Sequence, residues 1–396
     1  MPAASKLTAR RRWPVFGFSV AACIAQARSA GSADFDAELE VSGYADTDHV
    51  EVLTPAVSGT LSDARSGVSA TGGYVVDIVS GASVDIVSTA SERWVEVRQA
   101  ADLSVDYKPK DLGLTVSGSV SREPDYLSWS VGATGRIELD SDHVTPSLGY
   151  SFSHDTAGRS GTPYSVYALQ LVRHTAQVGV ELVLDRSSRL VLLSEGSLEL
   201  GRQEKPYRFL PLFDTATAAL IEPGESIESV NALRLPGRVA ERVPETRRRF
   251  TLTADWARRG ARHTLRANER LYADSWGLYA STSDLSWLWD VSSRLTLEPR
   301  ARFHVQSSVD FWQRAYAAEL DGAELSVPSL RSGDRELSAL WTASLGFGSE
   351  WRTQATYGQG WTFGALIELG FTQFLDALFI EQRSSGLVVL TVERAF

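Results

Sequence analysis

Alternation of apolar and polar residues, repeated along nearly the whole chain, is the feature that most constrains the fold. From about Ala37 to the end of the 396-residue chain, segments of roughly ten residues show this alternation and are separated by turn residues. In residues 294–306, every odd-numbered position from Leu295 to Val305 is apolar, whereas the even-numbered positions are charged or polar. A period of two places the two sets on opposite faces of a strand. The sequence therefore predicts an all-β protein.

The lengths of the connections between these segments separate two classes of all-β protein. A soluble sandwich and a membrane barrel both show alternation, so alternation alone does not distinguish them. Short connections are expected at 62–67, 108–111, 141–143, 185–188, 257–261, 290–293 and 348–350. Long connections are expected between them, at 81–93, 156–175, 202–246 and 307–335. Transmembrane barrels combine short periplasmic turns with longer extracellular loops, so this pattern favours a barrel with both termini in the periplasm.

The number of alternating segments gives the size of the predicted barrel. A transmembrane antiparallel up-and-down β-barrel of about 16 strands, the size of a porin, is predicted over residues 37–396. Strands are expected at 37–44, 49–61, 68–79, 94–107, 112–123, 126–140, 144–155, up to about 184, 189–201, 247–256, 262–272, 277–289, 294–306, 336–347, about 361–371 and 386–396. Short helices are expected in the loops at 215–221, 309–320 and 374–380.

The last segment, Gly386–Phe396, alternates like the others and ends the chain on an aromatic residue. It resembles the last strand of bacterial outer-membrane β-barrels, which the barrel-assembly machinery reads together with its terminal Phe. The resemblance implies that Phe396 is an assembly signal and that this machinery and outer-membrane lipids are partners of the chain. Arg394 falls on the nominal lipid face, where a long basic side chain near an interface can reach water. A soluble β-protein that ends in Phe is the alternative.

The N-terminus has the composition of an export signal. A basic segment ending at Arg12 precedes the short apolar run Trp13–Ala22, and small residues follow, with cleavage expected near Ala27. We therefore assign residues 1–27 to a signal peptide. The residues before Cys23 also resemble the lipobox of bacterial lipoproteins, and cleavage there would make Cys23 the lipidated first residue. Both sites of cleavage remain open at this point.

Composition limits the remaining classes of protein. No window after the signal approaches the ~20 apolar residues of a membrane helix, so a membrane protein with this sequence has to be a closed barrel. The 11 Trp residues suit aromatic girdles at two interfaces, and the net charge of -10 argues against affinity for nucleic acid. The single cysteine excludes an intrachain disulfide, and there is no haem-attachment motif or Cys/His zinc spacing. We expect no cofactor and no metal.

Four short segments suggest a narrower relationship. They are Val79–Ser83, Lys205–Phe209, Tyr272–Gly277 and Gln306–Phe311. In order and spacing they resemble a bacterial family labelled domain of unknown function 3570, which is predicted to form outer-membrane barrels. The resemblance extends from about Ser42 to Phe396 and brings no established activity with it. It also implies a link to gene neighbourhoods that encode thioredoxin-like and flavin-transferase proteins.

The polar set of each strand would line the lumen, and it carries charge. The candidate lumen residues are Glu96, Asp102, Asp106, Glu195, Glu199, Arg266, Arg270, Arg300, Arg302 and His304. In a closed barrel of 16 strands, the fourth and twelfth strands lie half a turn apart, so the acidic fourth strand would face the arginine-rich strands eleven to thirteen. Such opposed walls resemble the constriction of general porins. Alternatively, the charges pair between neighbouring strands and only satisfy a wet or plugged interior, which Arg98 and Arg136 on the acidic side favour.

Catalytic residues are not predicted. His154 and Asp155 are adjacent on one strand, so their side chains point to opposite faces and do not form a dyad. The other histidines are scattered, and no serine has the pattern of a nucleophile elbow. Three functions remain: a channel or solute transporter, a barrel scaffold for a periplasmic or redox partner protein, and, as the least favoured, an outer-membrane enzyme.

Overall fold

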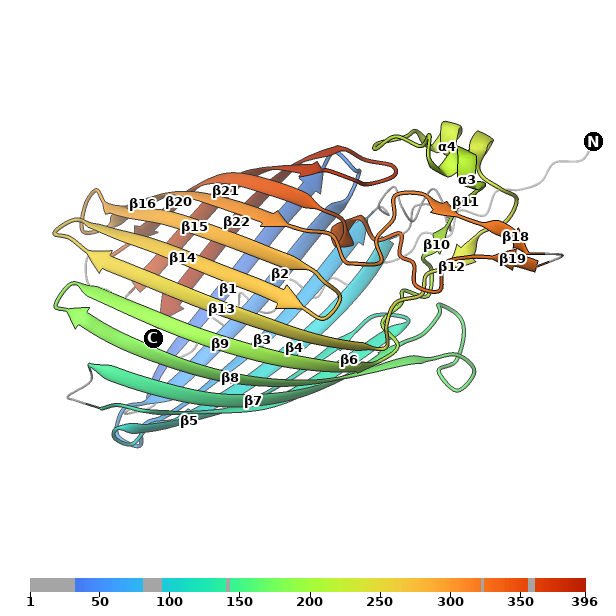
Figure 1. Ribbon diagram of the computed structural model, residues 1–396. Coiled ribbons are helices and arrows are strands. Elements are labelled where there is room, and N and C mark those ends of the chain that lie inside the picture. Colours follow the sequence, from blue (N-terminus) through green and yellow to red (C-terminus); the bar gives the residue numbers. More distant parts are fainter. Residues whose placement is uncertain (1–32, 81–94, 140–142, 322–323, 355–359) are drawn as a thin grey trace, which may run out of the picture.

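The protein is a closed barrel of sixteen antiparallel strands (Figure 1). The computed structural model describes residues 33–80, 95–139, 143–321, 324–354 and 360–396. The barrel strands are β1 (Ala33–Asp46), β2 (Glu51–Asp63), β3 (Val68–Ser80), β4 (Val95–Tyr107), β5 (Leu112–Arg122), β6 (Tyr126–Ile137), β7 (Val144–Ala157), β8 (Leu169–Asp185), β9 (Ser188–Gly201), β13 (Thr246–Arg259), β14 (His263–Asp274), β15 (Tyr279–Asp290), β16 (Leu295–Gln306), β20 (Leu340–Arg352), β21 (Gly360–Phe374) and β22 (Gln382–Ala395). Each strand pairs with its neighbours in the chain, so the topology is the predicted up-and-down meander.

The barrel closes where its last strand pairs with its first. The β1–β22 register runs from Asp36 opposite Ala395 to Asp46 opposite Ser385. Beyond the last pair, the backbone N–H of Phe396 donates to the carbonyl oxygen of Phe35 at 2.8 Å, and the two rings pack with centroids 5.7 Å apart. The terminal residue therefore extends the seam by one hydrogen bond and one ring contact.

We predict that Phe396→Ala lowers the amount of folded barrel in the outer membrane several-fold, because this side chain is both a seam contact and the expected recognition residue. Heat-modifiable migration of the membrane fraction on gels measures the folded barrel. Leu220→Ala is the control, since that side chain is 76% exposed in a loop. Equal folded yields of the two variants would refute an assembly role for Phe396.

The outer face of the barrel is apolar. Exposed large side chains on alternate strand positions include Val95, Leu103, Leu112, Val131, Leu148, Val178, Leu252, Leu285, Phe303, Leu345, Ile367 and Leu390. Aromatic rings form two bands, one near the short turns and one near the opposite end. Rings in contact are Trp287 with Trp289 and Trp351 with Phe363 at the turn end, and Trp129 with Phe152 and Trp341 with Phe371 at the other. A transmembrane barrel presents such a surface to lipid. Among the described residues, no helix has the length and apolar composition to span a bilayer.

Three connections pack together beyond one end of the barrel, and we call their described residues the cap: residues 202–245, 307–321, 324–339 and 375–381 (Figure 1). Its elements are β10 (Phe209–Leu210), β11 (Leu212–Phe213), α3 (Thr215–Ala218), α4 (Ile227–Leu233), β12 (Val239–Ala240), β17 (Tyr316–Ala317), β18 (Glu319–Asp321), β19 (Glu324–Ser326) and the 3-10 turn η1 (Arg335–Leu337). β10 pairs with β12, β11 with β17 and β18 with β19.

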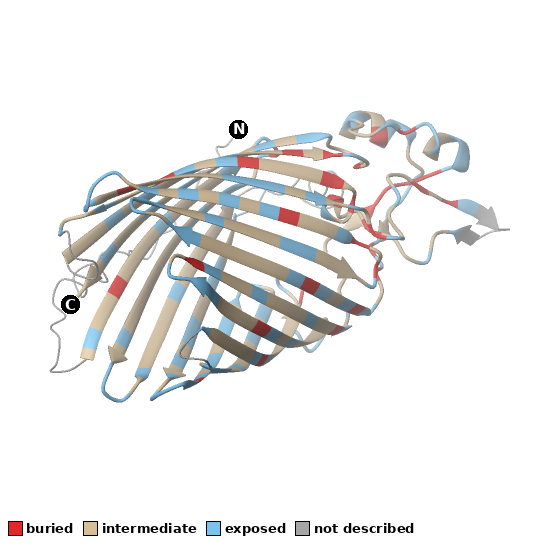
Figure 2. Ribbon diagram, turned by 60° about the vertical axis from the view of Figure 1, so that its left-hand side comes forward, coloured by how far each residue is buried: buried red, intermediate tan, exposed pale blue. Residues whose placement is uncertain are grey.

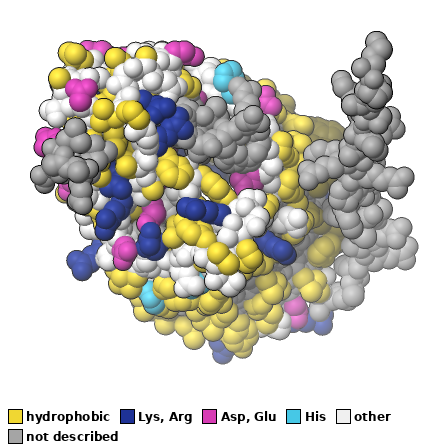
Figure 3. Space-filling model, turned by 90° about the vertical axis from the view of Figure 1, so that its right-hand side faces the viewer, with side chains coloured by type: hydrophobic (Ala, Val, Ile, Leu, Met, Phe, Trp, Pro, Cys, Tyr) yellow, Lys and Arg dark blue, Asp and Glu magenta, His cyan; other side chains and the backbone are white. Residues whose placement is uncertain are grey.

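Most of the buried apolar residues belong to the cap and to the strand ends beside it, as the distribution of buried residues in Figure 2 illustrates. One buried cluster joins Leu210, Leu212, Tyr316 and Ala318, and another joins Phe213, Ile221 and Val230. Figure 3 looks onto this end, where Lys and Arg side chains lie among hydrophobic ones. The cap is therefore a small packed unit in which connections far apart in the chain share buried clusters.

The strand count and strand order agree with the sequence prediction, including the first strand, but several local expectations are wrong. The expected turn at 348–350 lies inside β20. A Cβ at Gly346 would meet the side chain of Arg300 at 2.8 Å, and one at Gly348 would meet that of Glu298 at 3.4 Å. These glycines leave room for side chains of the neighbouring strand, so they do not mark a turn.

The helix expectations were mostly wrong. Residues 309–320 contain β17 and the start of β18, and Val309 and Tyr316 are buried in separate cap clusters. Of residues 374–380, Phe374 ends β21 and the others form bends and irregular backbone. The helix expected at 215–221 is only the four-residue α3, and α4 was not expected.

The connections at 47–50, 123–125 and 275–278 are short although they lie at the cap end, so the loop asymmetry is partial. Residues 1–27, with Cys23, lie outside the described residues, and the signal peptide and lipidation stay predictions.

Candidate functional site

The acidic candidates on β4 lie on the inner face of the barrel. Glu96, Asp102 and Asp106 alternate with the exposed Leu103 and Tyr107. The Thr115 hydroxyl on β5 donates to Asp106 at 2.5 Å. On the same face, Arg98 pairs with Asp77 of β3 at 2.6 Å. This wall therefore contains hydrogen-bonded and ion-paired carboxylates rather than a row of bare charges.

The basic candidates lie on β14 and β16. Arg300 pairs with Glu368 of β21 at 2.6 Å, reaching past β20 at Gly346, and Arg302 lies 3.7 Å from Asp284 of β15. The Thr282 hydroxyl and the His304 ring are 2.7 Å apart, and Thr282 stands opposite Arg270 in the register.

Arg266, Arg300 and Arg302 line an internal pocket of about 390 Å³, which we call the lumen pocket. Its carboxylates are Asp255, Asp284, Glu298 and Glu368. Three arginines thus face four carboxylates, and the wall is not a uniformly positive surface.

The glutamates of β9 also face inward. Glu199 is 1% exposed and lies between Arg173 at 2.7 Å and Arg249 at 3.1 Å. Glu195 lies four residues earlier on the same strand, and therefore on the same face. In ring order β4 is the fourth strand and β15 the twelfth of sixteen, so the acidic and basic walls occupy the expected opposite positions. The ion pairs nevertheless join residues on strands that lie close together. This agrees with the alternative in which the charges pair between strands and satisfy the interior. A role of these residues in conduction stays a prediction.

A second space, the cap cavity, lies between the cap and the cap-side ends of β6 to β9 and β13. Its volume is about 260 Å³. The lining residues are Tyr126, Asp155, Ala157, Leu169, Leu171, Arg173, Glu199, Arg202, Gln203, Glu204, Lys205, Arg208, Glu241, Val243, Arg247, Arg249, Trp276, Asp334 and Leu337. Six of these side chains are basic and five are acidic, so the cavity is strongly polar with both signs of charge.

Ion pairs fix the cap above this cavity. Arg208 binds Asp334 at 2.7 Å and Glu241 at 3.4 Å. Burial raises the pKa of the Glu241 carboxyl, an effect that the Arg208 guanidinium opposes. Arg335 of η1 pairs with Asp48 in the β1–β2 turn, and both side chains are 5% exposed. Apart from Arg208, which lies in the segment Lys205–Phe209, the sequence did not point to these residues, because their partners lie in loops far apart in the chain.

The segment after β14 contributes a further anchor. Arg247 pairs with Asp274 and lies over the ring of Trp276, 4.1 Å from its centroid. The Asp310 N–H donates to the carbonyl oxygen of Trp276 at 2.8 Å, and Val309 packs in the same buried cluster. Three of the four segments that carried the family resemblance therefore meet at the cap: Lys205–Phe209, Tyr272–Gly277 and Gln306–Phe311. That resemblance was the one sequence signal for this region.

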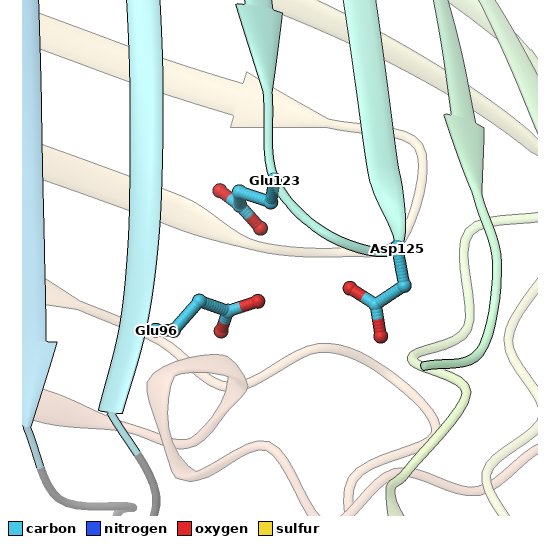
Figure 4. A group of neighbouring side chains, drawn as sticks. All are labelled: Glu96, Glu123 and Asp125. Atoms are coloured by element: carbon cyan, nitrogen blue, oxygen red, sulfur yellow. The ribbon is translucent and has the colours of Figure 1, made fainter. Parts of the chain in front are cut away.

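Three carboxylates converge near the mouth at the β5–β6 turn. Oxygen atoms of Glu96, Glu123 and Asp125 lie within 4.8 Å of one another and point inward toward a common point (Figure 4). Burial, and then the Glu96 charge, raise the pKa of Glu123. The Tyr207 hydroxyl donates to Asp125 at 2.5 Å. A calcium ion takes six to eight oxygen ligands, and one of these carboxylates is already occupied by a hydroxyl, so we assign no ion here.

The histidine beside an aspartate on β7 does not form a dyad. His154 stacks on Trp129 at 6.2 Å on the outer face, whereas Asp155 accepts a hydrogen bond from the Ser128 hydroxyl at 2.6 Å on the inner face. Their opposite orientation confirms the expectation from strand geometry.

Comparison with known proteins identifies the family. A family profile described as "Protein of unknown function (DUF3570)" matches residues 90–373. This chain belongs to the DUF3570 family. The DUF3570 match includes the three segments that meet at the cap, while Val79–Ser83 lies before it. The family resemblance expected from the sequence is thereby confirmed. No match was found among curated proteins.

The solved structures with a similar backbone fold are also bacterial barrels. Pseudomonas aeruginosa OccK5 (OpdH) has 10% identity and a TM-score of 0.43, over 93% of this chain and 100% of that one. The siderophore receptor PirA from Pseudomonas aeruginosa has 12% identity and a TM-score of 0.44, over 92% of this chain and 62% of that one. A bacterial polysaccharide outer membrane secretin has 10% identity and a TM-score of 0.45, over 91% and 98%. The chain spans about half the length of the ferric enterobactin receptor PfeA, 55% of it. At these scores we draw no functional argument from them.

Proposed function

We propose that this DUF3570 barrel lies in the bacterial outer membrane and acts as a porin-like channel or solute transporter with a charged lumen. The observation that carries the proposal is the separation of side chains across one wall. Apolar and aromatic residues cover the outer face, whereas the inner face carries ion-paired charges around the lumen pocket. An apolar outer face around a polar interior is the arrangement of transmembrane barrels, whose interior is a water-filled channel in porins.

We also propose an orientation for the barrel, based on the difference between its two ends. We place the short turns and Phe396 in the periplasm and the cap outside the cell, as in other transmembrane barrels. Outer-membrane lipids then surround the apolar belt, and the barrel-assembly machinery inserts the chain. A solute that enters from outside has to pass the cap, which the buried Arg335–Asp48 pair ties to the β1–β2 turn.

Planar-bilayer recording of the purified, folded protein tests the proposal. We expect discrete conductance steps, with weak charge preference because both signs line the lumen pocket. Folded protein that carries no ion current and is not a carrier of polar solutes in liposome-swelling assays would overturn the proposal. The scaffold for a periplasmic or redox partner would then be the better function, and co-purification with a periplasmic protein would support it. We propose no enzymatic activity.

Arg266 is the best position at which to change the selectivity of the lumen. Arg300 is paired with Glu368, but Arg266 lines the same pocket and has no ion pair within 4 Å among the described residues. We predict that Arg266→Glu shifts the reversal potential toward cations, because a carboxylate replaces a guanidinium beside low-dielectric walls. The shift is largest at low salt, where screening is weak. Arg65→Glu, at an exposed turn, is the control. An unchanged reversal potential in Arg266→Glu would place the ion path elsewhere.

A further inference from the structure

The cap cavity contains buried polar atoms that the protein itself does not satisfy. The side-chain nitrogen Nε2 of Gln203, Nε of Arg249 and the oxygen Oε2 of Glu204 have no hydrogen-bond partner among the described residues. All three side chains line this cavity, and that of Glu204 is only 11% exposed. Buried polar groups are almost always paired because leaving one unpaired is costly, so three in one cavity indicate a site that something else completes.

The unpaired atoms have complementary chemistry. Gln203 Nε2 and Arg249 Nε are donors, whereas Glu204 Oε2 is an acceptor: it is the second oxygen of a carboxylate whose Oε1 is ion-paired with Arg202. A ligand that satisfies all three needs an acceptor such as a carboxylate and a donor such as an ammonium group. The neighbouring charges have the same dual character, since Glu199 and Glu241 are buried here beside Arg173 and Arg208.

Size and access limit the ligand further. A volume of about 260 Å³ is several times the ~30 Å³ share of one water molecule and lies just below the range of drug-sized pockets. Arg202 and Lys205 are exposed lining residues, so the cavity meets solvent on the cap side. Arg202 is ion-paired there with Glu204 and lies 3.9 Å from Glu245, and Lys205 adds a positive charge that attracts the carboxylate end of an approaching solute. Trp276 and Leu337 give the remaining wall an apolar part.

We propose that the cap cavity is a binding site for a small zwitterion, a free amino acid or a dipeptide, on the path into the barrel. This inference rests on the proposed transport function and names its substrate class. The ligand carboxylate accepts hydrogen bonds from Gln203 and Arg249, and its ammonium group donates to Glu204. The apolar wall at Trp276 contacts the side chain of the ligand.

Isothermal titration calorimetry of the folded protein in detergent tests the site directly. The probes are L-alanine, L-leucine and alanyl-alanine, with acetate and methylamine as single-charge comparisons. We expect saturable binding of the zwitterions and at least tenfold weaker binding of acetate and methylamine, because each lacks one of the two charged contacts. Folded wild-type protein that binds no zwitterion, or binds acetate equally well, would overturn the proposal.

Variants assign the binding to the cavity. Glu204→Gln removes the carboxylate charge that faces the ammonium group and also pairs with Arg202, and we expect about a tenfold loss of affinity or more, as for a charge-assisted hydrogen bond. Gln203→Leu is an independent second variant that removes a donor and leaves the ion pairs intact. Glu319→Gln, an exposed cap residue away from the cavity, is the matched control. Affinities unchanged in both cavity variants would refute the site. Ion conductance without zwitterion binding would support the channel function and refute the binding site. Binding without conductance or solute flux would support the binding site and refute the channel function.

Discussion

Arg247→Met is expected to lower the free energy of unfolding by about 3–5 kcal/mol, the cost of removing one partner of a buried ion pair. Asp274 has a side chain with 0% exposure, and its partner Arg247 has 9%. Without the guanidinium, the Asp274 carboxylate keeps only neutral donors: the Tyr272 hydroxyl at 2.7 Å and the N–H groups of Trp276 and Leu278 at 2.8 and 3.1 Å. The stacking of Arg247 on the Trp276 ring is lost as well.

Urea titration of the barrel in lipid vesicles, followed by Trp fluorescence, measures this effect. Arg258→Met is the matched control, because Arg258 lies on the same strand and is exposed. It should change the unfolding free energy by less than about 0.5 kcal/mol. If Arg247→Met cost no more than Arg258→Met, the carboxylate of Asp274 would have to be solvated or neutral in the folded protein. The pair would then not anchor the cap.

The barrel was predictable from the sequence because its signal is local. Each strand carries its own period-two pattern, and the pleat turns that pattern directly into an outer and an inner face. On β6 the apolar residues from Leu127 to Ala133 alternate as exposed positions with less exposed polar ones, as expected from the sequence, and on β16 Ala301, Phe303 and Val305 are exposed together with Arg302. Even β1 and its pairing with β22 follow, since a barrel in lipid has to close.

The interior pairing and the cap were not predictable in the same way. Arg300 reaches Glu368 across β20 because Gly346, which lies between them, has no side chain in the way. The alternation in either strand does not predict that contact. Arg335 and Asp48 are 287 residues apart in the chain. The apolar residues at 309–320 suggested a helix, yet they pack into separate clusters around Trp276 and Leu210. Tertiary contacts overrode local propensity in these loops.

The cap cavity is lined partly by strand residues, whose direction the sequence pattern predicts, and partly by loop residues, whose positions it does not predict. The strand pattern places Arg173, Glu199 and Arg249 on the inner face, but the remaining walls come from loops. The motif Lys205–Phe209 marked the region without indicating its chemistry. Only the three-dimensional arrangement places Gln203 and Glu204 beside the β9 and β13 side chains with atoms unsatisfied.

The assignment of faces leads to the second large effect, at a single strand. Val131 lies in the middle of β6 on the outer face and is 51% exposed, whereas Thr134 lies on the inner face and accepts a hydrogen bond from Gln177 at 3.2 Å. We predict that Val131→Arg lowers the unfolding free energy by about 2–4 kcal/mol, the cost of an arginine at the bilayer midplane. Thr134→Arg should cost only about 1 kcal/mol, since it loses one hydrogen bond in a polar lumen. The comparison uses urea titration of both variants in the same lipid vesicles. Equal losses would mean that Val131 does not contact lipid, and the belt would have to be placed at another height on β6.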